Sequence, residues 1–382
     1  MQTLELLDRL IAFPTVSRDS NLDLIHFVQE YLNSHGVSSR LIYDEEGNKA
    51  NLHAIIGPED VPGIILSGHT DVVPVDGQDW SSDPFVMREE DGRHYGRGAA
   101  DMKGFVASVL AAVPTMTART LTRPIHLAFS HDEEIGCVGV RSMIDDLVNA
   151  PVKPALCIVG EPTLMKAAIG HKGKTDLVCT CHGVESHSAL APNGLNSIYL
   201  ASEMISAIRD MQTYVIETGA HDDHYAVPYT SLHVGVIGGG TALNIVPNTC
   251  KFRFEIRNLL EDDPMAILAK LEAKATEIAS AYQDRFPSAK IDITISNEYP
   301  GLNTAPDAEV VTFVKSLTGA NDHNKVAFGT EGGLFQERLG VPTVICGPGS
   351  MDQGHKPDEF ITAKQLGLCD DFLSRLLDRV AA

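Results

Sequence analysis

Seven acidic or histidine residues stand at points of the sequence where their chemistry could combine: His69, Asp71, Asp101, Glu133, Glu134, Glu161 and His355. Neutral imidazoles and carboxylates are the donors that catalytic zinc, cobalt or manganese sites use. No cysteine belongs to this set, which argues against a structural zinc site. The residue types therefore predict a catalytic site for divalent cations, with one coordination position left for water.

The spacing within this set predicts separate roles. A carboxylate can bridge two cations that lie ~3.5–4 Å apart, which a neutral imidazole cannot do, so Asp101 is the candidate bridge. In the His-x-Asp pair, the Asp71 carboxylate could accept the second ring N–H of His69 and fix its tautomer. If Glu134 binds a metal, its neighbour Glu133 could serve as general base, taking a proton from water and returning it to the leaving amine.

Taken one at a time, these residues also suit ordinary positions. A His-x-Asp pair after a strand is usually a loop, and an acidic pair at a helix start favours the helix dipole. Their joint placement argues for a site, because most of them follow strands predicted at 63–67, 125–130, 155–159 and 343–346. An open α/β sheet binds its ligands just beyond the carboxyl ends of its strands.

Asp101 is placed by a turn and a helix start and not by the end of a strand. It follows the glycine-rich turn at 96–98 and precedes a helix predicted at 103–113. The alternation of β-rich runs and helical stretches around these residues is typical of an α/β layer.

A different pattern interrupts the α/β pattern in the middle of the chain. Between about 175 and 296 the predicted order is β-α-β-β-α-β, typical of a ferredoxin-like domain with a four-stranded antiparallel sheet. We therefore expect an α/β catalytic metal-binding domain with a large mixed sheet, made of 1–173 and 299–382, and an inserted α+β domain at 174–298.

Composition excludes several classes of partner. The 382 residues carry a formal charge of −21, which argues against binding to nucleic acid or to an anionic membrane. No apolar run approaches the ~18 residues of a membrane span, and the N-terminus does not resemble a signal peptide. The seven cysteines are scattered through apolar runs, so we expect reduced core residues and a cytoplasmic protein.

Several stretches resemble the dinuclear, M20-like family of metallo-aminoacylases and carboxypeptidases. The matching stretches are 67–74, 95–104, 131–136, 160–163, and Gly183 with His187 and Ser188. The resemblance runs from about Leu4 to Leu377 and implies the same division into a catalytic domain and an inserted domain. In this family the inserted domain serves as a lid and for dimerisation, which implies a homodimer.

The resemblance also implies a set of metal ligands. One cation would be bound by His69, Asp101 and Glu161, and the other by Asp101, Glu134 and His355. The two divalent cations are expected to be zinc, with cobalt as the alternative.

Three further residues match catalytic positions of the family. Glu133 matches its general base, and Asp71 matches the residue behind the first metal-binding histidine. His187 matches a histidine that reaches across the dimer interface to polarise the scissile amide oxygen. Whether His187 acts in its own subunit or in the partner's stays open here.

Within this family, four stretches resemble the acetylornithine deacetylase branch: 170–173, 329–335, 346–349 and 355–359. Arg257 and Asn244 match positions that hold the substrate carboxylate and the amide oxygen, and a guanidinium gives the forked contact that a carboxylate prefers. Glu331 lies in a branch-specific stretch, so we expect it to pair with the cationic amine of the substrate.

The resemblance therefore implies hydrolysis of N2-acetyl-L-ornithine to L-ornithine and acetate by metal-activated water, a step of arginine biosynthesis. One alternative keeps the site but changes the substrate to acetylcitrulline, acetylmethionine or succinyl-diaminopimelate. Another is a catalytically silent metal-binding dimer on the same fold. Glu133 argues against the silent dimer, because a structural site has no use for an unbound carboxylate beside its ligands.

Overall fold

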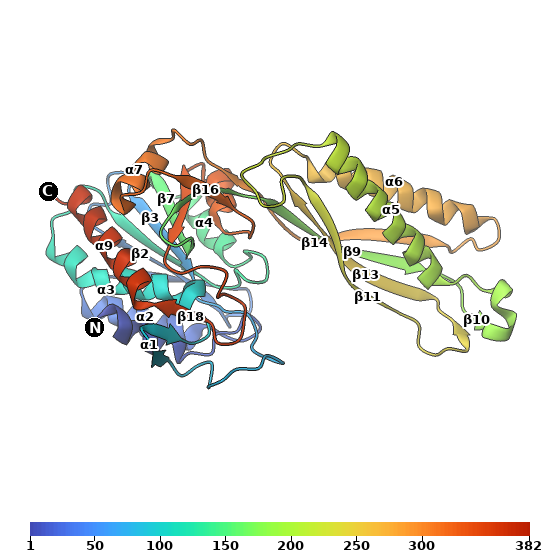
Figure 1. Ribbon diagram of the computed structural model, residues 1–382, viewed down its shortest axis with the longest axis horizontal. Helices are drawn as coiled ribbons and strands as arrows, with labels where there is room; N and C mark the ends of the chain where they lie inside the picture. Colours follow the sequence, from blue (N-terminus) through green and yellow to red (C-terminus); the bar gives the residue numbers. More distant parts are fainter. The chain divides into compact units, whose positions relative to one another are not determined.

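The computed structural model describes residues 1–382, which divide into two compact units. The first unit contains Met1–His171, Leu302–Val326 and Thr330–Ala382, and the second contains Lys172–Gly301 and Ala327–Gly329. Figure 1 shows the elements of both units. The short stretch Ala327–Gly329 joins the second unit from outside the expected insertion. None of the helices has the length and apolarity that crossing a bilayer requires.

A nine-stranded mixed sheet forms the centre of the first unit, in the order β1-β2-β6-β3-β7-β17-β8-β15, with β16 paired to β8. Its strands are β1 (Ser39–Tyr43), β2 (Ala50–Ile56), β3 (Ile64–His69), β6 (Ile125–Ser130), β7 (Leu156–Pro162), β8 (Ala167–His171), β15 (Leu302–Asn303), β16 (His323–Val326) and β17 (Thr343–Gly347). Neighbours β6, β3, β7 and β17 are parallel and buried along their whole length, so their carboxyl ends meet at one edge.

Helices and a small second sheet complete the first unit: α1 (Thr3–Ile11), α2 (Leu22–Ser34), α3 (Gly104–Ala118), α4 (Val140–Val148), α7 (Glu309–Thr318), α8 (Gly332–Leu334) and α9 (Ala363–Val380). Helix α3 packs against both α1 and α9, while α2 and α4 contact β2 (Figure 1). The small sheet has the order β18-β5-β4, from Phe360–Thr362, Arg93–Tyr95 and Arg88–Glu90. An irregular segment, Ala99–Lys103, leads into α3.

The second unit has the predicted β-α-β-β-α-β order and is ferredoxin-like. Its elements are β9 (Gly173–His182), α5 (Ser197–Thr218), β11 (Ser231–Gly239), β13 (Thr249–Asn258), α6 (Pro264–Gln283) and β14 (Lys290–Tyr299). The antiparallel sheet has the order β11-β13-β9-β14, and α5 and α6 lie side by side (Figure 1). Burial alternates along β9, so Cys179 and Cys181 share one buried face, in line with the expectation of core cysteines.

A short two-stranded sheet belongs to the second unit. It pairs β10 (Ser186–His187) antiparallel with β12 (Ile245–Val246), which lies far away in the sequence, and the 3-10 helix Ser188–Asn193 follows β10. The sequence pattern did not predict this strand pair, because two-residue strands carry no periodic signal. It also did not predict β8.

Candidate metal centre

The expected metal ligands gather at the carboxyl edge of the parallel strands. His69 is the last residue of β3, Glu161 is the penultimate residue of β7, and Glu133 and Glu134 lie in the turn after β6. His355 comes from the turn that follows β17. The side chains meet because β6, β3, β7 and β17 are parallel neighbours.

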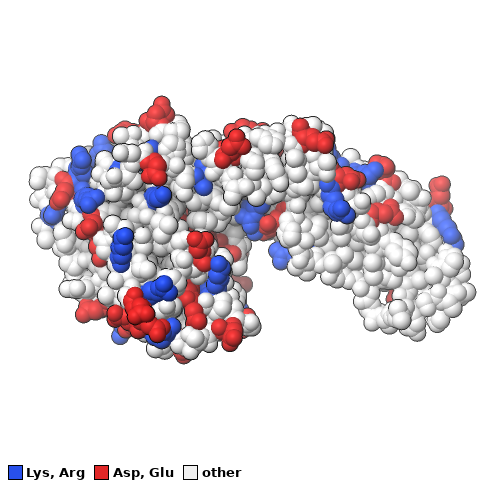
Figure 2. Space-filling view, in the orientation of Figure 1, with Lys and Arg blue, Asp and Glu red and all other residues white.

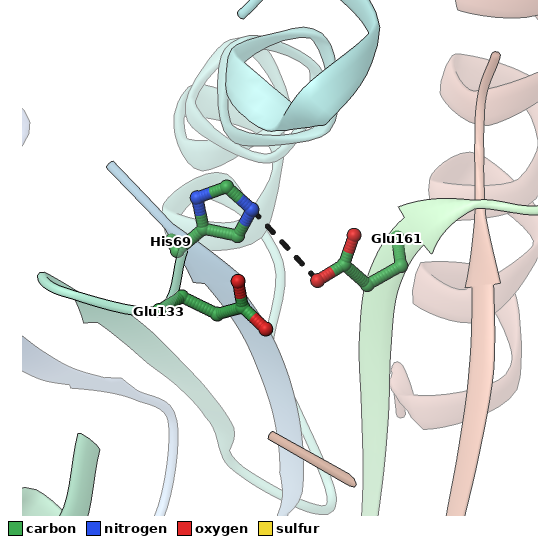
Figure 3. A group of neighbouring side chains, drawn as sticks. All are labelled: His69, Glu133 and Glu161. Atoms are coloured by element: carbon green, nitrogen blue, oxygen red, sulfur yellow. Dashed lines mark ion pairs between the residues drawn. The ribbon is translucent and has the colours of Figure 1, made fainter. Parts of the chain in front are cut away.

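Asp101 lies between the two histidines. Its Oδ1 is 3.1 Å from His69 Nε2, and its Oδ2 is 3.1 Å from His355 Nε2. His355 Nε2 also lies 3.0 Å from Glu134 Oε2. His69 Nε2 lies 3.8 Å from Glu161 Oε1 (Figure 3). A carboxylate that offers one oxygen to each imidazole has the arrangement that a bridge between two cations requires.

Two overlapping groups of side chains could each hold a cation: His69 with Glu133 and Glu161, and His69 with Asp101 and Glu134. Within each group the ligand atoms lie within 4.8 Å of one another. In Figure 3, the carboxylates of Glu133 and Glu161 point toward the ring of His69. Oxygen Oε1 of Glu134 is buried and has no hydrogen-bond partner, so it is a ligand atom without another use in the fold.

The charges of this cluster do not balance. Four carboxyl groups are packed around two imidazoles, and burial raises the pKa of Glu133 and that of Glu161 well above their usual values. Burial and the charge of Asp101 also raise the pKa of Glu134, to about 7. Divalent cations would remove this penalty, because they supply the positive charge that buried carboxylates need.

The two histidines respond to the same carboxylates. Burial alone would lower the pKa of His69, but the hydrogen bond to Asp101 and the charge of Glu161 raise it well above its usual value. Hydrogen bonds to Asp101 and Glu134 raise the pKa of His355 to about 10. Both imidazoles thus bond directly to the carboxylates with which they would share a cation.

Asp71 contacts His69 in a different way from the one expected. The ring Nδ1 of His69 lies 2.9 Å from the backbone oxygen of Asp71, whereas the nearest carboxylate oxygen is 3.7 Å away. The carboxylate accepts instead from the backbone N–H groups of Glu133 and Glu134, at 3.1 and 3.3 Å, and from the hydroxyl of Ser17 at 2.7 Å. Asp71 therefore orients the histidine through its main chain and holds the Glu133–Glu134 turn through its side chain.

A buried ion pair supports Asp101 and was not among the expected site residues. Glu359 Oε1 accepts from the backbone N–H groups of Ala100 and Asp101, at 2.9 and 3.1 Å, and its Oε2 lies 2.7 Å from Arg97. Arg97 and Glu359 are fully buried. The available signal was their type, since each is a charged residue inside a stretch that resembles a family motif.

A thiol contacts the expected general base. Cys137 Sγ lies 3.3 Å from Glu133 Oε1, so the thiol can donate to one oxygen and leave the other free. Nothing in the sequence pattern marked this cysteine, which was expected to be an ordinary core residue.

The expected contact between Glu331 and a substrate amine stays a prediction. Glu331 is 1% exposed, and its two carboxylate oxygens accept hydrogen bonds from the hydroxyls of Ser67, at 3.0 Å, and Ser130. A substrate cation would have to displace both hydroxyls to reach it. These serines lie near the ends of β3 and β6, so Glu331 also supports the strand ends next to the expected metal ligands.

The three remaining candidates, His187, Asn244 and Arg257, lie in the second unit. His187 ends β10 and Asn244 directly precedes its partner strand β12, and the backbone oxygen of Asn244 accepts from Ser188 N at 2.9 Å. Both side chains are exposed. Arg257, near the end of β13, donates to Glu255 Oε1 at 3.1 Å and to the Tyr299 hydroxyl at 3.2 Å.

Comparisons with known proteins show the family of this chain. Residues 65–379 match the model of peptidase family M20/M25/M40. The chain is 33% identical over 381 residues to the acetylornithine deacetylase of Pasteurella multocida, which covers 98% of this chain and 97% of that protein. It is 30% identical over 382 residues to the acetylornithine deacetylase of Proteus mirabilis, covering 98% and 96%.

Solved structures share the fold at low sequence identity. An M20 family metallo-carboxypeptidase of Sulfolobus solfataricus aligns with a TM-score of 0.79 at 20% identity, over 99% of this chain and 98% of that one. A dinuclear metal-binding peptidase of Bacillus subtilis aligns with a TM-score of 0.68 at 15% identity, over 98% and 96%.

Proposed function

The chain belongs to peptidase family M20/M25/M40 and is a metal-dependent hydrolase, and from this premise we propose that it hydrolyses N2-acetyl-L-ornithine to L-ornithine and acetate. Such a reaction would supply ornithine for arginine synthesis. The observation that carries the chemistry is the placement of Asp101 between two imidazoles, with the carboxylate of Glu133 beside them. The full-length similarity to acetylornithine deacetylases supports this choice of N-acyl amino acid.

We assign His69, Asp101 and Glu161 to one cation, and Asp101, Glu134 and His355 to the other. The unbalanced carboxylates and the unpartnered oxygen of Glu134 support this assignment. Imidazole and carboxylate donors suit Zn²⁺, with Co²⁺ as the alternative. When bound, such ions supply Lewis-acid polarisation and lower the pKa of water at the site.

Glu133 is the proposed general base. Its carboxylate would accept a proton from the attacking water and pass it to the amine that leaves. Two contacts keep the group available for proton transfer, because the backbone of Glu133 is anchored on Asp71 and Cys137 contacts only one carboxylate oxygen. Burial raises its pKa well above the usual value, and the positive charge of bound cations would oppose that shift.

His187 is the proposed donor to the oxyanion. Its Nδ1 accepts a hydrogen bond from the backbone N–H of Ala189 at 3.1 Å, which places the proton of the neutral ring on Nε2. An exposed Nε2–H is free to donate to a substrate oxygen. Asn244 precedes β12, the strand paired with that of His187, and is the proposed second contact to the amide oxygen, while Arg257 is the proposed contact to the substrate carboxylate.

We also propose a homodimer formed through the second unit. Strand β11 is at the edge of its sheet, and two adjacent apolar side chains on it, Val236 and Ile237, are 63% and 52% exposed. An exposed apolar edge strand favours pairing with another chain. Sedimentation equilibrium would show a dimer, and charged substitutions at these two positions should weaken it.

The location in the cell remains a prediction. All seven cysteines are buried free thiols, which suits a reducing compartment such as the cytoplasm.

A substrate panel tests the proposed reaction. Protein saturated with Zn²⁺ would be assayed on acetylornithine, acetylcitrulline, acetylmethionine and succinyl-diaminopimelate, with the metal counted per subunit. We expect the largest kcat/KM for acetylornithine and two metals per subunit. A larger value for another substrate would reassign the specificity, and no activity on any of them would contradict the proposed reaction.

A further inference from the structure

The two metal-binding histidines differ in what holds their backbone. His69 ends a buried strand, whereas His355 lies in a turn and its side chain is 45% exposed. The backbone of His355 has a φ of 62°, in the left-handed region that residues with a Cβ rarely adopt. Such a conformation persists only where surrounding contacts enforce it.

Two side chains hold this turn by consecutive carbonyl groups. Gln78 Nε2 donates to the backbone oxygen of His355 at 3.0 Å, and Arg97 donates to that of Lys356 at 3.3 Å. Gln78 Oε1 also accepts from Arg97 and, at 3.0 Å, from Trp80 Nε1. The amide of Gln78 therefore uses both of its ends, one on the turn and one on the guanidinium.

The same guanidinium is connected to Asp101 through Glu359. Arg97 pairs with Glu359 at 2.7 Å, and Glu359 accepts from the backbone N–H of Asp101 at 3.1 Å. A continuous series of hydrogen bonds thus joins the backbone carbonyl of His355 to the backbone N–H of Asp101, the proposed bridging residue.

We propose that Gln78 is a positioning residue, which acts through Arg97 and Glu359 to hold the His355 turn in register with Asp101. This inference rests on the proposed dinuclear centre. It assigns the hydrogen-bond series to one cation position, the one that His355 would share with Asp101 and Glu134. The other cation position should depend less on Gln78, because His69 ends a buried strand and Glu359 still accepts from the backbone N–H of Asp101 when Gln78 is replaced.

The test is a calorimetric titration of metal-free protein with Zn²⁺. Gln78→Met removes both hydrogen-bonding ends of the side chain at nearly constant size. We expect one zinc equivalent to bind about 10- to 100-fold more weakly, since residues that orient metal ligands have effects of this size. The other equivalent should change by less than about 3-fold. His355→Ala identifies which equivalent belongs to the His355 position.

Two further variants control the interpretation. Ser81→Ala removes a hydroxyl that bonds Asp358 at 2.8 Å in the same region but leaves Gln78 intact, so both equivalents should bind as in the wild type. Gln78→Asn keeps an amide but is too short to span both partners, and it should reproduce the selective loss.

The outcomes are distinguishable. Unchanged affinities in both Gln78 variants would overturn the positioning role, and so would an equal weakening of both equivalents, which indicates general loosening of the fold. A wild-type protein that binds fewer than two zinc ions per subunit would instead contradict the proposed dinuclear centre.

Discussion

The two units present their candidate functional groups in opposite ways. In the first unit, Asp101 and Glu161 are 4% and 3% exposed, and Asp101 lies 3.1 Å from each of two imidazoles. In the second unit, His187 and Asn244 lie exposed at the short β10-β12 strand pair. Figure 2 shows one face of the surface, where basic and acidic side chains are intermixed.

Each arrangement suits the role proposed for it. Like charges can be packed together only where many hydrogen bonds and a cation compensate them, which requires a rigid and buried site. A group that must contact a substrate has a partner outside the chain, so its donor has to stay free. We therefore propose that the first unit binds the metals and transfers the proton, and that the second contacts the substrate.

The largest effect should come from Glu133→Ala in the first unit. Losing a general base costs about 10²–10⁴-fold in kcat, and we expect the upper end because the neighbouring carboxylates Asp101, Glu134 and Glu161 are proposed metal ligands. Both metals should remain, since Glu133 is not a proposed ligand. Metal analysis beside steady-state kinetics checks both statements, and a mild loss of kcat would remove Glu133 from this role.

His187→Ala tests the second unit in the same way. Removing an oxyanion donor costs about 10²–10³-fold in kcat, and the metal content should not change. His187→Gln, which keeps an N–H donor, should recover part of the loss. A change in metal content would place His187 among the metal ligands and contradict the division between the units.

Mixing two inactive proteins tests whether His187 acts across a dimer. If it does, exchange of subunits between Glu133→Ala and His187→Ala dimers should restore partial activity, because each hybrid has one site with both groups intact. If subunits exchange and activity does not return, His187 serves the site of its own subunit.

Glu331→Gln should have a smaller effect that does not depend on the substrate. Because Glu331 bonds Ser67 and Ser130 below the site, we expect kcat/KM to fall about 10-fold for both acetylornithine and acetylmethionine. A selective loss with acetylornithine would instead indicate direct contact with its amine, as expected from the sequence.

The smallest effect should appear in stability, away from both sets of candidate residues. His53 Nε2 lies 3.1 Å from His126 Nδ1, and burial lowers the pKa of each histidine from 6.5 to about 4. Between these pH values the unfolded chain binds protons that the folded protein does not, so stability falls as the pH drops from about 6.5 to 4 and then levels off. His126→Gln should reduce that loss by about 1–2 kcal/mol, measured by urea unfolding at pH 7.5 and pH 4.5. An unchanged pH dependence would show that these histidines do not control it.

Residues whose placement follows from regular elements were predictable. His69, Glu161 and the Glu133–Glu134 pair come at or just after strands that are buried throughout, and parallel strands align their carboxyl ends. The β-α-β-β-α-β order of the second unit was predictable for the same reason, because the change between two- and 3.6-residue periodicity is local. The short β10-β12 strand pair beside His187 and Asn244 was not predictable, since each strand has too few residues to show a period.

Contacts between distant residues followed another logic. Ser67 and Glu331 are 264 positions apart, and Glu359 reaches the backbone of Asp101 across 258 positions. Such pairs form because buried polar groups must find partners, and which partner is near depends on how the whole chain packs. Residue types and local periodicity thus predict which groups can bind metal and move protons. Only the tertiary structure decides the contacts of the supporting residues, because the strands and turns that carry them must first be brought together. These residues are Asp71, Glu331, Gln78, Arg97 and Glu359.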